Sequence, residues 1–212
     1  LSHADMRALF GTCRTCRDAV KVFMKSAMKV DKVLRRFFRE DNKIGQFQYL
    51  QGETGMIVTG SVALQLFNRE EYKNCDLDTY CILKRCGVVG EWYQSIGYAF
   101  EAAGRQKARF SEDYERTMAA LGMDREDVML RIGSDIHGGE RYMSHNIAEV
   151  WNFRNTEGVK IQLVATDIIP EAVVLAFHST CVMNILTQKA AYALFPNITF
   201  LRNETLLVNA KG

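Results

Sequence analysis

A short apolar segment that ends in Gly-Ser, followed by a segment with two alternating aspartates, constrains this chain more than any other feature. Residues 56–59 are Met-Ile-Val-Thr, Gly60 and Ser61 come next, and residues 62–67 predict a short helix. A second strand is expected from residue 77 to residue 83. Because successive strand side chains point to opposite faces, Asp76 and Asp78 should share one face. The pattern predicts an α/β or α+β fold.

These four residues also predict a site. The backbones of Asp76 and Asp78 should lie about 6 to 7 Å apart, which lets their carboxylates share divalent cations. The turn before them exposes backbone N–H groups at a helix N-terminus, where phosphate oxygens bind well. Alternatively, the aspartates are solvated or form an Asx turn, Gly60 only makes a tight turn and Ser61 only caps a helix. Two aspartates on one strand face repel each other unless a cation compensates, which favours a metal-nucleotide site.

The Gly60-Ser61-Val62-Ala63-Leu64 segment with Asp76-Leu77-Asp78 resembles the polymerase-beta-like nucleotidyltransferase superfamily, and especially its branch with bacterial abortive-infection toxins. Residues 177–184 and 192–196 are also similar to segments of uncharacterised proteins from mushroom-forming fungi that carry the same signature. The resemblance covers roughly residues 56–200. It implies a mixed sheet flanked by helices, with Asp76 and Asp78 holding Mg²⁺ or Mn²⁺ and Gly60 and Ser61 holding the terminal phosphates of a nucleoside triphosphate.

In the resembling enzymes a third carboxylate on a later strand completes a two-metal site. The alternation of strand faces over residues 159–164 places Gln162 at that position, and an amide brings no negative charge. Glu149 on the partner strand and Asp167 at the strand end are two possible substitutes. Gln162 therefore puts full activity in doubt.

Composition narrows the class of protein. A chain of 212 residues with 48% hydrophobic residues is one generous domain or two small ones. The sequence shows no apolar run of membrane-spanning length and no secretory leader. Six irregularly spaced cysteines indicate reduced thiols in a cytoplasmic or nuclear protein. Cys13-x-x-Cys16 and His178-x-x-Cys181 supply soft ligands, but pairs so far apart form only a weak zinc pattern.

The N-terminal segment is basic. Residues 1–40 contain ten Lys or Arg against four Asp or Glu, whereas the remainder contains 17 against 21. Apolar residues at steps of three and four predict one long amphipathic helix over 18–39. The cations on its other face form what we call the basic ridge, and a solvated face or a surface for RNA or a triphosphate tail both explain it. The ridge comprises Lys21, Lys25, Lys29, Lys32, Arg36 and Arg39.

Three regions are expected: a basic helical arm over 1–50, a nucleotidyltransferase-like core over 51–170, and a C-terminal extension over 171–212 packed on that core. Residues 41–55 should form a polar connection and 88–104 a helix. Ser111 should cap a helix that ends near Gly122, and Asp124 should begin another, followed by a long loop over 133–143. A hairpin is expected from 147–154 and 159–166, and Pro170 should open a helix through Phe177.

The sequence thus predicts metal-dependent transfer of a nucleoside monophosphate from a nucleoside triphosphate to a hydroxyl of RNA, protein or a small molecule. Gln162 favours a degenerate alternative that binds nucleotide or a partner without catalysis. A third alternative, a nucleic-acid-binding module, requires only the basic ridge. No membrane partner is expected.

Overall fold

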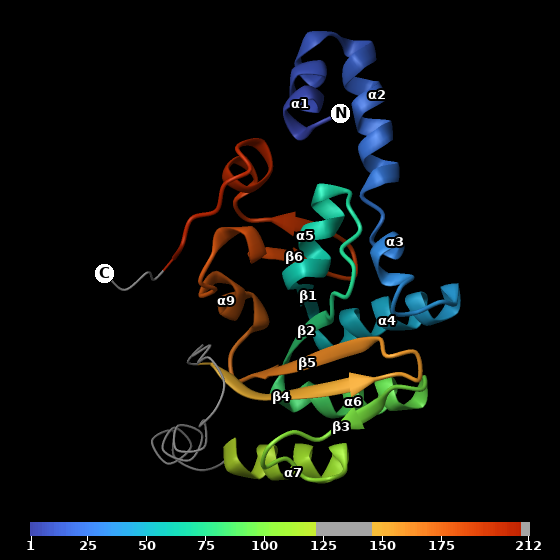
Figure 1. Ribbon diagram of the computed structural model, residues 1–212, viewed down its shortest axis with the longest axis vertical. Helices are drawn as coiled ribbons and strands as arrows, with labels where there is room; N and C mark the ends of the chain where they lie inside the picture. The colour runs from blue at the N-terminus through green and yellow to red at the C-terminus, as the bar shows by residue number, and fades with distance from the viewer. Residues whose placement is uncertain (122–145, 209–212) are drawn as a thin grey trace.

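The computed structural model describes residues 1–121 and 146–208, and its centre is a seven-stranded mixed sheet (Figure 1). The strand order is β3-β4-β5-β2-β1-β6-β7, and only β2 and β5 run parallel. The strands are β1 Ile57–Thr59, β2 Leu77–Ile82, β3 Ala99–Glu101, β4 Ile147–Arg154, β5 Lys160–Thr166, β6 Asn184–Leu186 and β7 Ala191–Ala193. The expected mixed fold is therefore confirmed.

Helices occupy both the faces and the ends of this sheet. They are α1 His3–Thr12, α2 Arg14–Ala27, α3 Val30–Leu34, α4 Asp41–Thr54, α5 Gly60–Asn68, α6 Leu83–Ser95, α7 Phe110–Leu121 and α9 Pro170–Leu175, with a 3₁₀ turn η1 at Thr180–Val182 and a π-helical turn η2 at Asn197–Leu201. None of the described helices has the length and apolarity that crossing a bilayer requires.

The main core lies between one sheet face and helices α4, α6 and α7. In β2 the odd positions are buried and the even positions are half-buried, so Leu77, Thr79 and Cys81 face the core. Tyr93 of α6 is buried in that core and donates to Thr79 Oγ1 at 3.1 Å. The even positions, which include Asp78, therefore face the opposite side of the sheet.

That opposite side is only partly covered. Ile57 of β1 packs with Val174 of α9, and the Tyr80 and Phe177 rings lie 5.7 Å apart. Thr59 donates its hydroxyl to the carbonyl of Val182 at 3.2 Å. These contacts cover the β1 part of the face, whereas the β5 and β4 part carries polar side chains.

The structure corrects three predictions in the N-terminal half. The expected helix over 18–39 is two helices, because the chain is extended at Lys29, with φ −75° and ψ 118°. Residues 41–55 form helix α4 and not a polar connection. The expected helix over 88–104 begins earlier and ends at Ser95, and Phe100 belongs to β3.

The other predictions have mixed outcomes. The hairpin of β4 and β5 and the start of α9 at Pro170 are confirmed, although α9 ends at Leu175. Helix α7 has the expected extent, but it begins at Phe110, so Ser111 lies inside the helix and the prediction that it is the N-cap is wrong. The segment from Asp124 and the loop over 133–143 lie outside the described residues. Residues after 170 do more than pack on the sheet, because β6 pairs with β1 and β7 pairs with β6.

Candidate functional site

The structure brings the predicted site residues together at the junction of β1, β2 and β5. Thr59 at the end of β1 pairs with Asp78, and Asp78 is also in parallel register with Gln162. Gly60 begins helix α5 directly after β1. Gln162 therefore lies beside the aspartate pair, as expected from the resemblance together with strand alternation.

Gly60 and Asp78 are in close contact. Gly60 has a φ of +69°, and a Cβ at this position would lie only 2.4 Å from Asp78 Oδ2. A side chain at residue 60 would thus clash with the carboxylate, besides adopting a backbone conformation that L residues rarely take. This contact places the Asp78 carboxylate against the first residue of helix α5.

The first turn of α5 has no side-chain cap. Thr59 is the N-cap residue and makes no capping hydrogen bond, because its hydroxyl donates to Val182 instead. The first N–H groups of a helix have no partner within the helix, and the helix dipole makes that end positive. The turn that carries Gly60 and Ser61 is therefore suited to bind phosphate oxygens next to Asp78.

Lys160 is a charged neighbour that the sequence interpretation did not include. Its Nζ lies 3.1 Å from Asp76 Oδ2, and the two side chains are 22% and 38% exposed. Asp76 directly precedes Leu77, whose register partner is Ile161, so Lys160 is its neighbour across the parallel pair. The alternation of apolar and polar residues over 159–162 was the sequence signal that puts Lys160 on the same strand face as Gln162.

The amide of Gln162 connects Lys160 to Asp78. In the orientation that satisfies both neighbours, Gln162 Nε2 donates to Asp78 Oδ1 at 3.1 Å and its Oε1 accepts from Lys160 Nζ at 3.0 Å. Asn152, the register partner on β4, has its side-chain oxygen 3.1 Å from the same amide. Asp76, Lys160, Gln162 and Asp78 therefore form one polar cluster, which we call the aspartate cluster.

Electrostatics at Asp78 are dominated by burial. Burial and then the Asp76 charge raise the pKa of Asp78 to about 6, and the Lys160 ammonium opposes them. Burial and the Asp78 charge also raise the pKa of Tyr80, so its hydroxyl stays protonated at neutral pH. At pH 7 the site thus holds two carboxylates and one ammonium, which leaves a net negative charge.

Neither proposed substitute for the third carboxylate lies in this cluster. Glu149 Oε2 accepts from Arg116 at 2.8 Å and Glu149 Oε1 from Gln106 at 2.9 Å, so it is bound to the α7 side. Asp167 is five residues beyond Gln162, roughly 16 Å further along the strand direction. Within the described ranges, no group of three His, Cys, Asp or Glu side chains is placed to hold a metal ion.

The cluster nevertheless has a suitable donor set for one divalent cation. The carboxylates of Asp76 and Asp78 are hard oxygen ligands, which Mg²⁺ and Mn²⁺ prefer, whereas the Gln162 amide turns its nitrogen toward Asp78. The Lys160 ammonium already forms an ion pair with Asp76, so a bound cation would compete with it for the Asp76 carboxylate. The residues fit one cation better than two.

The basic ridge is not a continuous surface. Arg36 Nη1 donates to the carbonyl of Tyr72 at 2.6 Å and contacts Cys75 Sγ at 3.2 Å. Arg39 forms an ion pair with Glu157 in the β4–β5 turn. Two of its six cations therefore stabilise the fold, and the interpretation of the ridge as one helix face is wrong.

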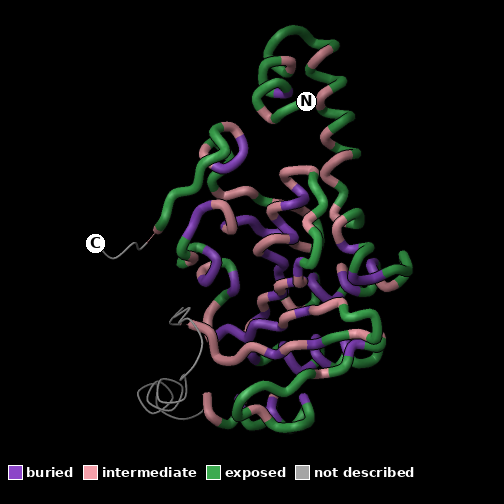
Figure 2. Tube along the Cα trace, viewed as in Figure 1, coloured by how far each residue is buried: buried purple, intermediate pink, exposed green. Residues whose placement is uncertain are grey.

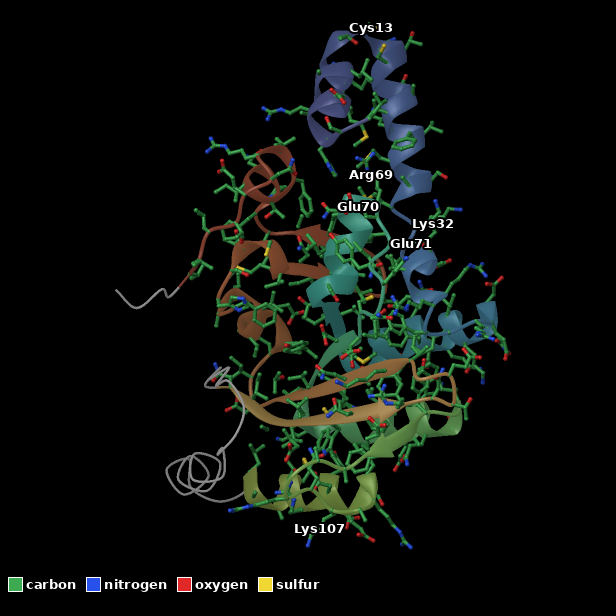
Figure 3. The ribbon with its side chains drawn as sticks, viewed as in Figure 1. Cys13, Lys32, Arg69, Glu70, Glu71 and Lys107 are labelled. Carbon is green, nitrogen blue, oxygen red and sulfur yellow. The ribbon has the colours of Figure 1, made fainter. Side chains whose placement is uncertain are left out.

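A cavity of about 1380 Å³ lies between the N-terminal helices and the end of α5. Figure 3 shows Lys32, Arg69, Glu70 and Glu71 in the region between α3 and α5. All four line the cavity, as do residues 72–74, which lead directly into Asp76. The cavity thus opens beside the segment that carries the aspartate cluster, although Asp76 and Asp78 do not line it.

Comparisons of this chain with protein-family profiles, with curated proteins and with solved structures gave no match in any of the three.

Proposed function

We propose that the protein binds a nucleoside triphosphate with Mg²⁺ or Mn²⁺ and transfers the nucleoside monophosphate to a hydroxyl of RNA, protein or a small molecule. The observation that supports this best is the contact between Asp78 and Gly60, because it joins a carboxylate ligand to a free helix N-terminus. The resemblance of the Gly-Ser and Asp-x-Asp segments points to the same chemistry.

In this proposal each residue has a distinct task. Asp76 and Asp78 hold the cation, which when bound neutralises the phosphates and stabilises charge on the reacting oxygens. The N–H groups of Gly60 and Ser61 bind the terminal phosphate oxygens. Asp78 must be ionised for this task, so cation binding should weaken as the pH falls through about 6.

A second candidate is nucleotide binding without catalysis. Two contacts favour it: Lys160 already neutralises Asp76, and Gln162 occupies the position where a third carboxylate would add negative charge. A site with only one cation would bind phosphates but would not clamp both the attacking and the leaving oxygen.

Calorimetry distinguishes nucleotide binding at this site from non-specific electrostatic attraction. MgATP and MgGTP should bind the wild type, and Asp76→Asn with Asp78→Asn should abolish the dependence on the cation. The control is Glu53→Gln with Glu115→Gln, which removes the same charge from exposed helix positions. Equal cation-dependent affinity in the aspartate variant and the control would refute the site.

Transfer is tested with α-³²P-labelled triphosphates, cell RNA and cell extract. The aspartates are required for any labelled product, and Gln162→Asp should raise both cation affinity and transfer, because it adds a carboxylate beside Asp78. Binding without product in the wild type and in Gln162→Asp would favour the non-catalytic candidate. Wild-type transfer that Gln162→Asp abolishes would show that the amide itself takes part.

A further inference from the structure

Cys13 and Cys16 lie at the corner between α1 and α2, at the end of the molecule furthest from the sheet (Figure 3). Cys13 is both the C-cap of α1 and the N-cap of α2, with φ −148° and ψ 171°. The backbone N–H of Cys16 donates to Cys13 Sγ at 3.5 Å. Cys13 is exposed and Cys16 is half-buried, so reagents can reach the pair.

The surroundings of Cys13 favour its thiolate. The backbone N–H of Cys16, followed by the Cys16 thiol, lowers the pKa of Cys13. Cys13 is the N-cap of α2, which contains 14 residues, so the positive end of a full helix is also present. A helix N-terminus is one of the features that activate cysteines in C-x-x-C pairs.

The other cysteines differ from this pair. Cys75, Cys81 and Cys86 are buried, so they are protected from reagents. Cys181 is half-buried and has no cysteine three residues before or after it. Only Cys13 thus combines exposure, a helix N-terminus and a second thiol within one turn.

We propose that Cys13 and Cys16 form a thiol–disulfide exchange site that donates two electrons to low-molecular-weight or protein disulfides. The Cys13 thiolate attacks one sulfur of a disulfide, forms a mixed disulfide and releases the first thiolate. Cys16 then loses its proton, attacks Cys13 Sγ and releases the second thiolate. The protein loses two electrons and two protons, and the disulfide becomes two thiols.

The geometry of the pair allows the bond to close. The capping contact already holds Cys13 Sγ 3.5 Å from the backbone nitrogen of Cys16, so a rotation of the two side chains suffices to bring the sulfurs together. A metal site is less well supported, because a structural zinc needs four ligands and the described part of the chain has no cluster of three metal-binding side chains. The proposal is independent of the aspartate cluster.

Redox titration of the whole chain tests this proposal. The reduced, metal-free protein is equilibrated with glutathione at varied ratios of oxidised to reduced form, quenched with acid, alkylated and mapped by mass spectrometry. The wild type should form the Cys13–Cys16 disulfide. Cys16→Ser should stop at a glutathione adduct on Cys13, and Cys13→Ser should form neither product. The control Cys181→Ser should behave as the wild type.

Alkylation by iodoacetamide at pH 7 is the second measurement. Cys13 should react several-fold faster than Cys181, because it is exposed at a helix N-terminus and its pKa is lowered by the Cys16 N–H, and the gain in thiolate exceeds the loss in nucleophilicity. Equal rates for both cysteines, or adducts on Cys13 and Cys16 without an intramolecular disulfide, would overturn the proposal. Protection of both thiols by one Zn²⁺ per two chains would replace it with a metal-bridged dimer.

Discussion

At the residue scale, Asp78 links stability to pH. Burial and the Asp76 charge raise its pKa from 3.8 to about 6. Its contribution to stability is fully present below about 3.8 and is progressively lost between these values, because the folded chain keeps a proton that the unfolded chain has already released. As the pH rises through about 6 the buried carboxyl ionises, and the shift corresponds to a cost of about 3 kcal/mol.

Asp78→Asn should therefore raise the free energy of unfolding at pH 7.5 without divalent cations, by about 1 to 3 kcal/mol. The gain should be smaller at pH 4.5, because Asp78 is then uncharged in the folded state of the wild type. Urea unfolding at both pH values measures the difference, and Glu115→Gln is the control at an exposed position. A gain that is the same at both pH values would contradict the raised pKa.

Gly60 allows a second prediction, with Gly55 as its control. Both residues have nearly the same φ, +69° and +70°, but only Gly60 has a neighbour where a Cβ would be. Gly55→Ala should cost about 1 kcal/mol from backbone strain, and Gly60→Ala should cost about 1 kcal/mol more, because the Asp78 carboxylate must shift to make room for the Cβ. Asp78→Ala should remove most of that excess in a double-mutant cycle. Equal costs for the two glycine variants would show that the contact is unimportant.

At the element scale, the buried side chain of Asp113 holds helix α7 against strand β4. Asp113 is fully buried and accepts from Trp151 Nε1 at 2.8 Å, from the backbone N–H of Lys107 at 2.8 Å and from Arg116. Burial acts to raise the pKa of Asp113, but the bonds from Arg116, Lys107 and Trp151 outweigh it and lower the pKa. The ion pair also positions Arg116 to bind Glu149, which keeps that carboxylate away from the aspartate cluster.

Asp113→Ala should destabilise the protein by about 3 to 5 kcal/mol, because it leaves buried N–H donors without an acceptor. Glu112→Ala, one residue earlier on the exposed side of α7, should cost less than about 1 kcal/mol. Chemical denaturation measures the stability, and tryptophan fluorescence of a Trp92→Phe background reports the environment of Trp151. Similar costs for the two variants would show that α7 does not depend on the Asp113 bonds.

At the scale of the whole molecule, the boundary of the N-terminal region lies near residue 28. Figure 2 shows few buried residues in α1 and α2, and Met6 is the one buried side chain of these two helices. Leu34, Phe37 and Phe38 belong to the main core, as do Ile44 and Phe47 of α4. The core thus extends well into the region that the sequence assigned to the basic arm.

Deletion of residues 1–28 should leave a chain that unfolds cooperatively with a lower Tm. Deletion of residues 1–50 should abolish cooperative unfolding, because it removes several aromatic and aliphatic side chains from the core. Circular dichroism during heating measures both. A cooperative transition after the longer deletion would show that α3 and α4 are dispensable for the fold.

The sequence by itself determined the elements whose signals are local. Apolar runs that end in Gly-Ser gave β1 and the start of α5, and alternation gave the β4–β5 hairpin and the strand face of Gln162, whose place beside Asp78 was expected from the resemblance. The apolar spacing of Ile44, Phe47 and Leu50 was also present, but Gly45, Gly52 and polar residues masked helix α4. Strand alternation succeeds because it depends only on backbone geometry.

Tertiary structure decided what depends on contacts between distant segments. The stripe over 18–39 is continuous in sequence, yet residues near Leu34 pack on the main core while α2 packs on α1, so the helix breaks between them. The pairing of β6 with β1 and the ion pair of Lys160 with Asp76 join residues more than 80 positions apart. No local pattern encodes such partners, because burial and charge pairing are properties of the packed chain.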